Sequence, residues 1–187
     1  MSKSGTFRKI QSVIKIFVWL NSFVPKRVNK FFLIIFRNTP TKIGILIRYV
    51  LLKNICKHCG DNVIVYPSVV FDAPEMMELG NDVSIHPFCY LAGAITIGDY
   101  VSIAHTTAFH SHNHTWENNK LPIKMNPIKG ERIIIENDVW VACNCVILSG
   151  VVIGTRSVIA AGAIVTKSFP NNSIIAGNPA KIIKKIC

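Results

Sequence analysis

The sequence predicts an all-β solenoid, in which the chain winds in triangular coils whose faces are short parallel strands. Two regularities carry this prediction. Aliphatic or aromatic residues recur every six positions over most of the chain, and turn-like tetrads rich in Gly, Asn and Asp recur on a period near 18. Three six-residue faces make one coil, and each coil buries its apolar side only against its neighbours, so several coils are needed. A β-sandwich would show alternation of period two and less regular turns.

The six-residue ladder has one interruption. It consists of Val65, Phe71, Leu79, Ile85, Leu91, Ile97, Ile103 and Phe109, followed by Ile135, Val141, Ile147, Ile153, Ile159 and Val165. The step from Phe109 to Ile135 is 26 residues, which is one step of six plus about 20 extra residues. We therefore expect about five coils and a long loop insertion at about 113–132, where Pro122 and Pro127 lie.

The longer period marks the corners of the coils. Turn-like tetrads open at Cys59, Leu79, Ile97, Ile135 and Ile153, with separations of 20, 18, 38 and 18 residues. The separation of 38 is one coil of 18 plus the same insertion. Gly, Asn and Asp suit these corners because they tolerate a left-handed backbone conformation.

Residues 1–58 form a basic, apolar arm ahead of a solenoid domain at 59–187. The arm holds twelve of the 21 Lys and Arg and none of the 10 Asp and Glu of a chain whose net charge is +11. The rest of the chain is nearly neutral and lacks the basic field of a nucleic-acid-binding protein, so no nucleic-acid partner is expected. Helical spacing of apolar residues, with breaks at Pro25 and Pro40, predicts helices from about residue 7 to 20, 26 to 37 and 41 to 54.

The arm has no segment that could span a membrane. Its longest charge-free run is Ile16 to Pro25, whereas a spanning helix needs about 18 apolar residues or more. No secretion signal is recognisable, because lysines interrupt the apolar run. We therefore expect a cytoplasmic chain with free thiols, and Cys56 and Cys59 lack the second pair of a structural zinc site. Two interpretations of the helices stay open: packing on the protein or a partner subunit, or attachment to the anionic inner face of a membrane.

The chain resembles the hexapeptide-repeat acyltransferases. The resemblance rests on I-T-I-G-D-Y-V-S-I-A at 95–104, S-H-N-H at 111–114, I-I-I-E-N-D-V-W-V-A at 133–142 and V-T-K-S-F-P-N-N-S-I-I-A-G-N-P-A-K-I-I-K at 165–184. It looks closest to sugar O-acetyltransferases of surface-polysaccharide or O-antigen biosynthesis, and more distantly similar to maltose and galactoside acetyltransferases. The resemblance implies a left-handed parallel β-helix, acetyl-CoA as acyl donor, no metal, and a homotrimer with active sites between subunits. We also expect a short C-terminal helix that carries Lys181 and Lys184.

The resemblance also implies a histidine that acts as general base. In this family it removes the proton of an acceptor hydroxyl while that oxygen attacks the thioester, without an acyl-enzyme. Imidazole suits this task because its ordinary pKa lies near neutral pH. Matching S-H-N-H to the family pattern of small residue, His and Asp or Asn selects His112, with His114 second and His110 third. In one strand these three side chains would alternate so that all could face one way.

Further site residues carry over from the family. Acceptor contacts fall on His86, where relatives often have Asn, and on Trp116 in the insertion. Small residues would let the pantetheine part of acetyl-CoA lie along the edge of the coils. Lysines would interact with the phosphates of acetyl-CoA as point charges. The matching positions for acetyl-CoA are Ala142, Cys143, Ala161, Thr166, Lys167, Lys181 and Lys184.

The expected function is acetyl-CoA-dependent O-acetylation of a sugar hydroxyl in a surface polysaccharide or its precursor. Two alternatives stay open. The H-x-H-x-H cluster at 110–114 could bind zinc in a metalloprotein of the γ-carbonic-anhydrase type, although ligands in that family come from neighbouring coils and subunits. The β-helix could also be a scaffold without catalytic activity.

Overall fold

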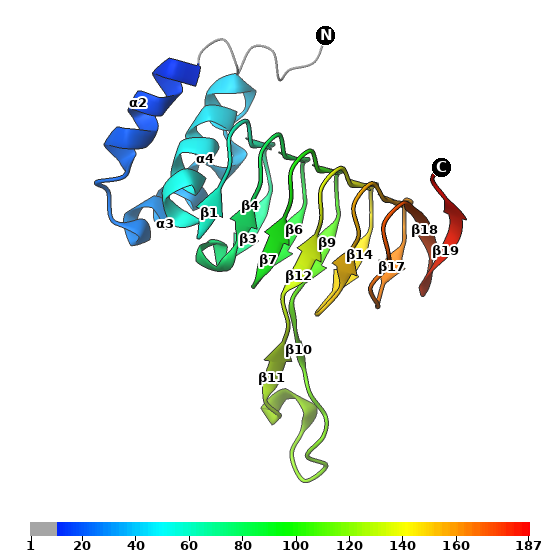
Figure 1. Cartoon of the computed structure of the whole chain (residues 1–187). Coiled ribbons are helices and arrows are strands. Elements are labelled where there is room, and N and C mark those ends of the chain that lie inside the picture. Colours follow the sequence, from blue (N-terminus) through cyan, green and yellow to red (C-terminus); the bar gives the residue numbers. More distant parts are fainter. Residues whose placement is uncertain (1–10) are drawn as a thin grey trace.

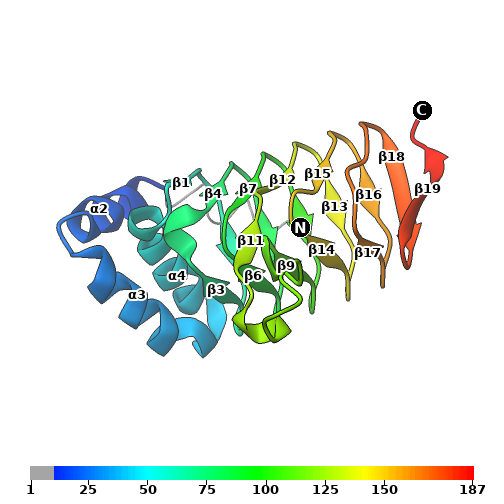
Figure 2. The same cartoon turned by 90° about the horizontal axis from the view of Figure 1, so that it is seen from below.

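The computed structural model describes residues 11–187 as a parallel β-solenoid with helices at one end and a hairpin at the other (Figures 1 and 2). The predicted all-β solenoid is confirmed, and it fits the left-handed β-helix that the resemblance implies. Each coil passes through three sheets, which we call A, B and C in chain order. Sheet B has six parallel strands, one more than the five coils expected, and sheets A and C have five each in the described part of the chain.

The strands are short and their bounds repeat from coil to coil. Sheet A contains β1 (His58–Cys59), β4 (Glu78–Leu79), β7 (Ile95–Ile97), β12 (Ile133–Ile135) and β15 (Val152–Ile153). Sheet B contains β2 (Ile64–Val65), β5 (Ser84–Ile85), β8 (Ser102–Ile103), β13 (Trp140–Val141), β16 (Val158–Ile159) and β18 (Ser173–Gly177). Sheet C contains β3 (Val70–Asp72), β6 (Tyr90–Ala92), β9 (Ala108–His110), β14 (Val146–Leu148) and β17 (Ile164–Val165).

The six-residue ladder forms the core. Ile135 pairs with Ile97 on one side and with Ile153 on the other, and all three side chains are buried. The pairing of Ile97 with Ile135 confirms that the 38-residue separation is one coil plus an insertion. Each fully buried aliphatic side chain of this kind contributes roughly 1.5–3 kcal/mol to folding.

The corners between sheets A and B explain the turn-like tetrads. The fourth residue of each tetrad has a left-handed backbone, with φ of 54° at Asp82, 59° at Tyr100 and 55° at Asp138. Side chains also link successive coils. The N–H of Asp99 donates to Oδ1 of Asn137 (2.8 Å), and the N–H of Asn81 donates to Oδ1 of Asp99 (2.6 Å). Asn and Asp therefore serve both the turn and the contact between coils.

From residue 11 onward the arm forms three α-helices, which cover the first coil: α2 (Gln11–Asn21), α3 (Lys26–Ile35) and α4 (Thr41–Ile55), with the 3-10 helix η1 (Phe36–Asn38) after α3. The predicted helices are confirmed where the structure describes them, and the first part of the first helix, with Phe7, lies outside the described residues. Leu52 and Ile55 of α4 are fully buried in the same hydrophobic core as Val65. No helix among residues 11–187 is long and apolar enough to cross a bilayer.

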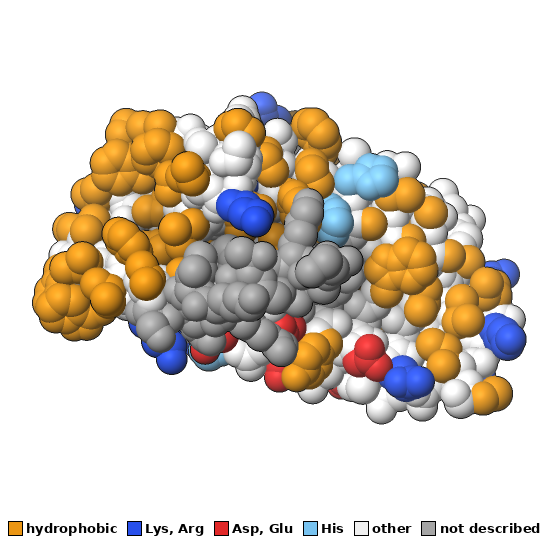
Figure 3. All heavy atoms as spheres, turned by 90° about the horizontal axis from the view of Figure 1, so that it is seen from above, with side chains coloured by type: hydrophobic (Ala, Val, Ile, Leu, Met, Phe, Trp, Pro, Cys, Tyr) orange, Lys and Arg blue, Asp and Glu red, His pale blue; other side chains and the backbone are white. Residues whose placement is uncertain are grey.

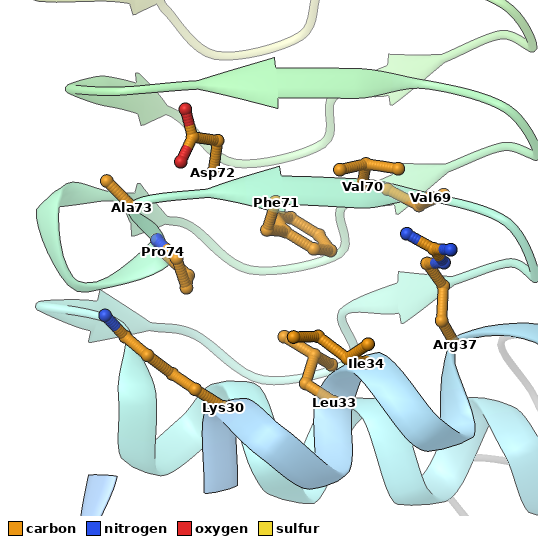
Figure 4. A pocket seen from close by; sticks show the side chains of 10 residues that line it. All are labelled: Lys30, Leu33, Ile34, Arg37, Val69, Val70, Phe71, Asp72, Ala73 and Pro74. Atoms are coloured by element: carbon orange, nitrogen blue, oxygen red, sulfur yellow. The ribbon is translucent and has the colours of Figure 1, made fainter. Parts of the chain in front are cut away.

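A second contact between arm and solenoid lies beside α3. In Figure 4, Leu33 and Ile34 of α3 face Phe71 of β3 across a pocket of about 220 Å³. Lys30 of α3 also pairs with Glu75 of the 3-10 helix η2 (Pro74–Met76), with 2.7 Å between Nζ and Oε2. The helices are therefore packed directly onto the solenoid.

Arg48 of α4 supplies hydrogen bonds that the first coil lacks. Strand N–H groups donate to the carbonyls of the following coil, as Tyr66 does to Ile85 (2.9 Å). Among the described residues no strand precedes the first coil, so the strand carbonyls of that coil receive no hydrogen bond from a preceding strand. The side chain of Arg48 is only 1% exposed, and its Nε donates to the carbonyl of Val65 (3.0 Å). Its Nη1 donates to the carbonyls of Phe36, Arg37 and Thr39 at 3.1, 3.2 and 2.9 Å. One buried side chain thus joins the solenoid to the chain that follows α3.

The insertion is an antiparallel ribbon that projects from the solenoid (Figure 1). It consists of β10 (His112–His114), the 3-10 helix η3 (Ile123–Met125) and β11 (Ile128–Gly130). Its position agrees with the insertion expected at about 113–132.

The expected C-terminal helix is wrong. The segment is a strand, β19 (Ala180–Lys185), which pairs antiparallel with β18 after a turn at Gly177, whose φ is 100°. A helix of six residues has little intrinsic stability, whereas a strand pairs with the open edge of the last coil. Lys181 and Lys184 therefore lie on an edge strand.

Candidate active site

His112 lies where the insertion leaves the solenoid, at the corner between sheets C and A. It is the first residue of β10, is exposed, and pairs with Gly130 of β11. A Cβ atom on Gly130 would lie 2.7 Å from the Cβ of His112. A Cβ atom on Gly93, in the preceding coil, would lie 3.1 Å from Nδ1 of His112 and 2.1 Å from Oγ of Ser111. The histidine therefore packs against Gly93 and Gly130, where there is no room for a side chain, and its Nδ1 faces Gly93.

Two serines fix the base of the ribbon. Ser111 is buried, and its Oγ accepts a hydrogen bond from the N–H of Ala94 (2.8 Å). Ser149, in the next coil, donates through Oγ to the carbonyl of Ser111 (2.9 Å) and accepts from the N–H of Glu131 (2.8 Å). Ser149 thus connects the departing and returning ends of the insertion. The sequence motif indicates Ser111 only as the small residue before His112, and neither Gly93 nor Ser149 was predicted, although Ser149 follows Ser111 by the same 38 residues that separate Ile97 and Ile135.

The three histidines do not line one strand, so the expectation that all could face one way is wrong. His110 ends β9 in sheet C, and its ring lies 5.6 Å from that of Tyr90. The chain then turns through Ser111 and starts a separate two-stranded sheet, which carries His112 and His114. In the part of the chain that the structure describes, no three His, Cys, Asp or Glu side chains gather as a metal site would require.

The two expected acceptor residues lie on different parts of the molecule. His86 follows β5 at the corner between sheets B and C, where its ring stacks on Tyr66 with centroids 4.7 Å apart. Trp116 follows β10 by two residues in the insertion and is 74% exposed. A single chain therefore does not bring His86 to His112.

The residues expected to bind acetyl-CoA fall into three groups. Ala142 and Cys143 follow β13 and Ala161 follows β16, on neighbouring coils at the corner between sheets B and C. There the N–H of Gly162 donates to the carbonyl of Cys143 (2.9 Å). Thr166 and Lys167 are exposed after β17, on the same edge of the solenoid as His112. Lys181 and Lys184 are exposed on β19.

The cysteines differ in accessibility. Cys56 and Cys59 are buried, and burial raises the pKa of the Cys59 thiol to about 12. Burial likewise raises the pKa of Cys89 to about 11. Cys143 is only partly buried, so it is an accessible thiol among the residues expected to contact acetyl-CoA.

Known proteins share both the repeat and the fold. Residues 132–167 match the family described as bacterial transferase hexapeptide (six repeats). WbbJ of Escherichia coli K12, named provisionally as a lipopolysaccharide biosynthesis O-acetyl transferase, is 32% identical over 114 residues, and the chain spans 58% of its length. Galactoside O-acetyltransferase of Escherichia coli K12 is 33% identical over 138 residues, which cover 73% of this chain and 67% of that protein.

Two solved structures extend the similarity over most of the chain. A hexapeptide-repeat acetyltransferase of Vibrio cholerae O1 biovar eltor, in complex with acetyl coenzyme A, has a TM-score of 0.77 and 28% identity over 87% of each chain. A galactoside acetyltransferase in complex with coenzyme A has a TM-score of 0.78 and 31% identity, over 87% of this chain and 81% of that one. The chain therefore belongs to the family of hexapeptide-repeat acetyltransferases.

Proposed function

We propose that the chain is an acetyl-CoA-dependent O-acetyltransferase that acts on a sugar hydroxyl of a surface polysaccharide or its precursor. The observation that carries this proposal is the exposed His112 at the base of the insertion, seated on Gly93 and Gly130. Acetyl-CoA and CoA occupy two structural relatives, which supports the donor. The names of galactoside O-acetyltransferase and WbbJ support a sugar acceptor in polysaccharide synthesis.

The proposed reaction is direct transfer with His112 as general base. Because Nδ1 faces Gly93, the other ring nitrogen, Nε2, is directed away from that backbone and accepts the proton of the acceptor hydroxyl. The hydroxyl oxygen attacks the thioester carbonyl carbon and gives a tetrahedral intermediate, whose oxyanion needs hydrogen-bond donors. Collapse of the intermediate breaks the C–S bond. The CoA thiolate takes the proton from the imidazolium, and the products are the acetyl ester and free CoA.

The proposal includes a homotrimer. His112 lies at one corner of the solenoid, whereas His86, Ala142 and Cys143 lie at another. If these residues serve one reaction, a neighbouring copy must bring its corner to His112. Light scattering is expected to give three times the mass of the chain, and a monomer would contradict this part of the proposal.

The proposed location is the cytoplasm, where acetyl-CoA is made, and the acceptor is a glycan held at the inner face of the membrane by a lipid carrier. Support for this location is the basic and apolar composition of residues 1–58, which hold no Asp or Glu.

Release of free thiol from acetyl-CoA in the presence of nucleotide sugars and lipid-linked glycans tests the function. We expect release with at least one acceptor, a loss of about 100-fold or more in turnover for His112→Ala, and near-normal turnover for the exposed control His114→Ala. Near-normal turnover of His112→Ala together with loss in His114→Ala would exchange their roles. If calorimetry detects no binding of acetyl-CoA, the β-helix is a scaffold without catalytic activity. Stoichiometric zinc in the purified protein would favour the metalloprotein of the γ-carbonic-anhydrase type.

A further inference from the structure

The helices at the end of the molecule expose many apolar side chains. The outer face, as we call it, is formed by α2, the turn after it and α3. Its exposed apolar side chains include Ile16, Phe17, Trp19, Leu20, Phe23, Val28, Phe31 and Ile35. Trp19 and Phe23 form an edge-to-face pair with centroids 5.2 Å apart, and Phe23 is 71% exposed. Contiguous apolar surfaces of this kind usually mark an interaction site.

The outer face is the side of the helices on which no other described element packs. Both α2 and α3 pack on α4, and their inward side chains, Ile14 and Leu33, are buried in the common core. Figure 3 shows hydrophobic side chains gathered over the end of the molecule that carries these helices. The apolar side chains of the outer face are therefore additional to those that stabilise the fold.

Basic residues accompany this face without acidic ones. Residues 11–58 contain no Asp or Glu. Lys53 and Lys57 pair with the solenoid residues Asp61 (2.9 Å) and Glu78 (2.7 Å), as Lys30 does with Glu75. Lys26 donates to the carbonyl of Ile55 (3.4 Å), and Lys15 helps to lower the pKa of Asp61, so both lie toward α4 and the solenoid. The exposed Arg27 and Lys42 have no carboxylate within ion-pair distance among the described residues. The ion pairs of the arm therefore lie on the side of the helices that meets the solenoid.

We propose that the outer face binds the surface of an anionic lipid bilayer. Aromatic and aliphatic side chains would enter the boundary between headgroups and acyl chains, and the unpaired Lys and Arg would meet anionic headgroups. A second copy of the chain fits the same face less well, because pairing two acid-free faces would bring like charges together. This inference goes beyond the proposed acetyl transfer and does not depend on it.

Co-sedimentation of the full chain with vesicles tests this inference. The vesicles are phosphatidylcholine alone, or phosphatidylcholine mixed with phosphatidylglycerol. We expect binding to the mixed vesicles that weakens with salt. The double change Arg27→Gln and Lys42→Gln should weaken binding roughly fivefold for each charge removed. Phe23→Ser should weaken it by about tenfold.

Phe88→Ser is the matched control, because Phe88 is an aromatic residue with similar exposure (66%) on a corner of the solenoid. It should leave vesicle binding unchanged. Circular dichroism and thermal unfolding of each variant show that the fold is kept. Absence of binding by the full chain, or equal losses in Phe23→Ser and Phe88→Ser, would overturn the proposal. So would a change of oligomeric state in Phe23→Ser, which would make the outer face a contact between copies. Thiol release with a water-soluble acceptor and no lipid reports on acetyl transfer separately.

Discussion

Replacing Gly93 by Ala tests whether the backbone of the preceding coil sets the position of His112. Gly93 has a φ of 83°, where an L-residue costs about 1–2 kcal/mol. The new Cβ would lie 2.1 Å from Oγ of Ser111, so that serine must move and its hydrogen bond with the N–H of Ala94 is strained or lost, at about 1 kcal/mol. We therefore expect Gly93→Ala to lower the free energy of unfolding by about 2–3 kcal/mol.

The same substitution should slow catalysis. The Cβ would also lie 3.1 Å from Nδ1 of His112, and Ser111 precedes that histidine in the chain. A displacement of the base by about 1 Å costs about 100-fold in rate. We expect the turnover number to fall by about that factor while the KM for acetyl-CoA changes little.

Gly162→Ala is the control that separates backbone strain from steric contact. Gly162 has a similar φ of 74°, but no atom lies within 4 Å of the position of its Cβ. It should cost only about 1 kcal/mol of unfolding free energy. Urea unfolding monitored by circular dichroism compares the stability of the two variants, and thiol release from acetyl-CoA measures the turnover number of Gly93→Ala. If Gly93→Ala costs no more stability than Gly162→Ala, or keeps near-normal turnover, Gly93 does not position His112.

Four further predictions follow from individual contacts. Ser149→Ala removes the hydroxyl that links both ends of the insertion. It should lower turnover about tenfold and lower the free energy of unfolding, measured with urea, by about 1–2 kcal/mol. Unchanged turnover would show that the ribbon is held by its strand pairing alone. Arg48→Ala should lower the free energy of unfolding by about 3–5 kcal/mol, because the buried carbonyl of Val65 and three partly buried carbonyls lose their donor, and a loss below about 1 kcal/mol would contradict this. Alkylation of Cys143, followed by mass spectrometry, should slow when acetyl-CoA is added, whereas equal rates with and without it would place the donor elsewhere. The hydrogen bond from Lys53 lowers the pKa of Asp61. The contribution of this carboxylate to stability is therefore present above the unfolded pKa of about 4 and is lost as the pH falls through the lower folded pKa. Asp61→Asn should flatten the acid limb of a plot of urea midpoint against pH, and an unchanged slope would refute this.

The repeat in the sequence determined the solenoid. An inward-pointing residue in each strand must stack on its counterpart in the next coil, so the six-residue ladder contains the register directly. The pairing of Ile97 with Ile135 could be predicted by counting, because an insertion changes the separation along the chain but not the stacking. The helices of the arm were equally accessible, since Pro25 and Pro40 interrupt a helical pattern at fixed points.

The C-terminal segment shows where local pattern is insufficient. Ala180–Lys185 is a short run with lysines and isoleucines, and such a run is compatible with a helix or a strand. The open edge of β18 decides for a strand, because it offers hydrogen bonds that an isolated short helix would lack. That edge exists only once the coils have formed.

The candidate site divides in the same way. The sequence by itself determined that the chain is a β-solenoid with a basic helical arm, and the motif S-H-N-H singled out His112. Only the tertiary structure decided that His110 belongs to a different sheet and that Gly93, Ser111 and Ser149 surround the base of the ribbon. These contacts join residues from three coils, with 38 residues between Ser111 and Ser149. A six-residue period specifies which side chains point inward, but the neighbours at a corner depend on how consecutive coils stack.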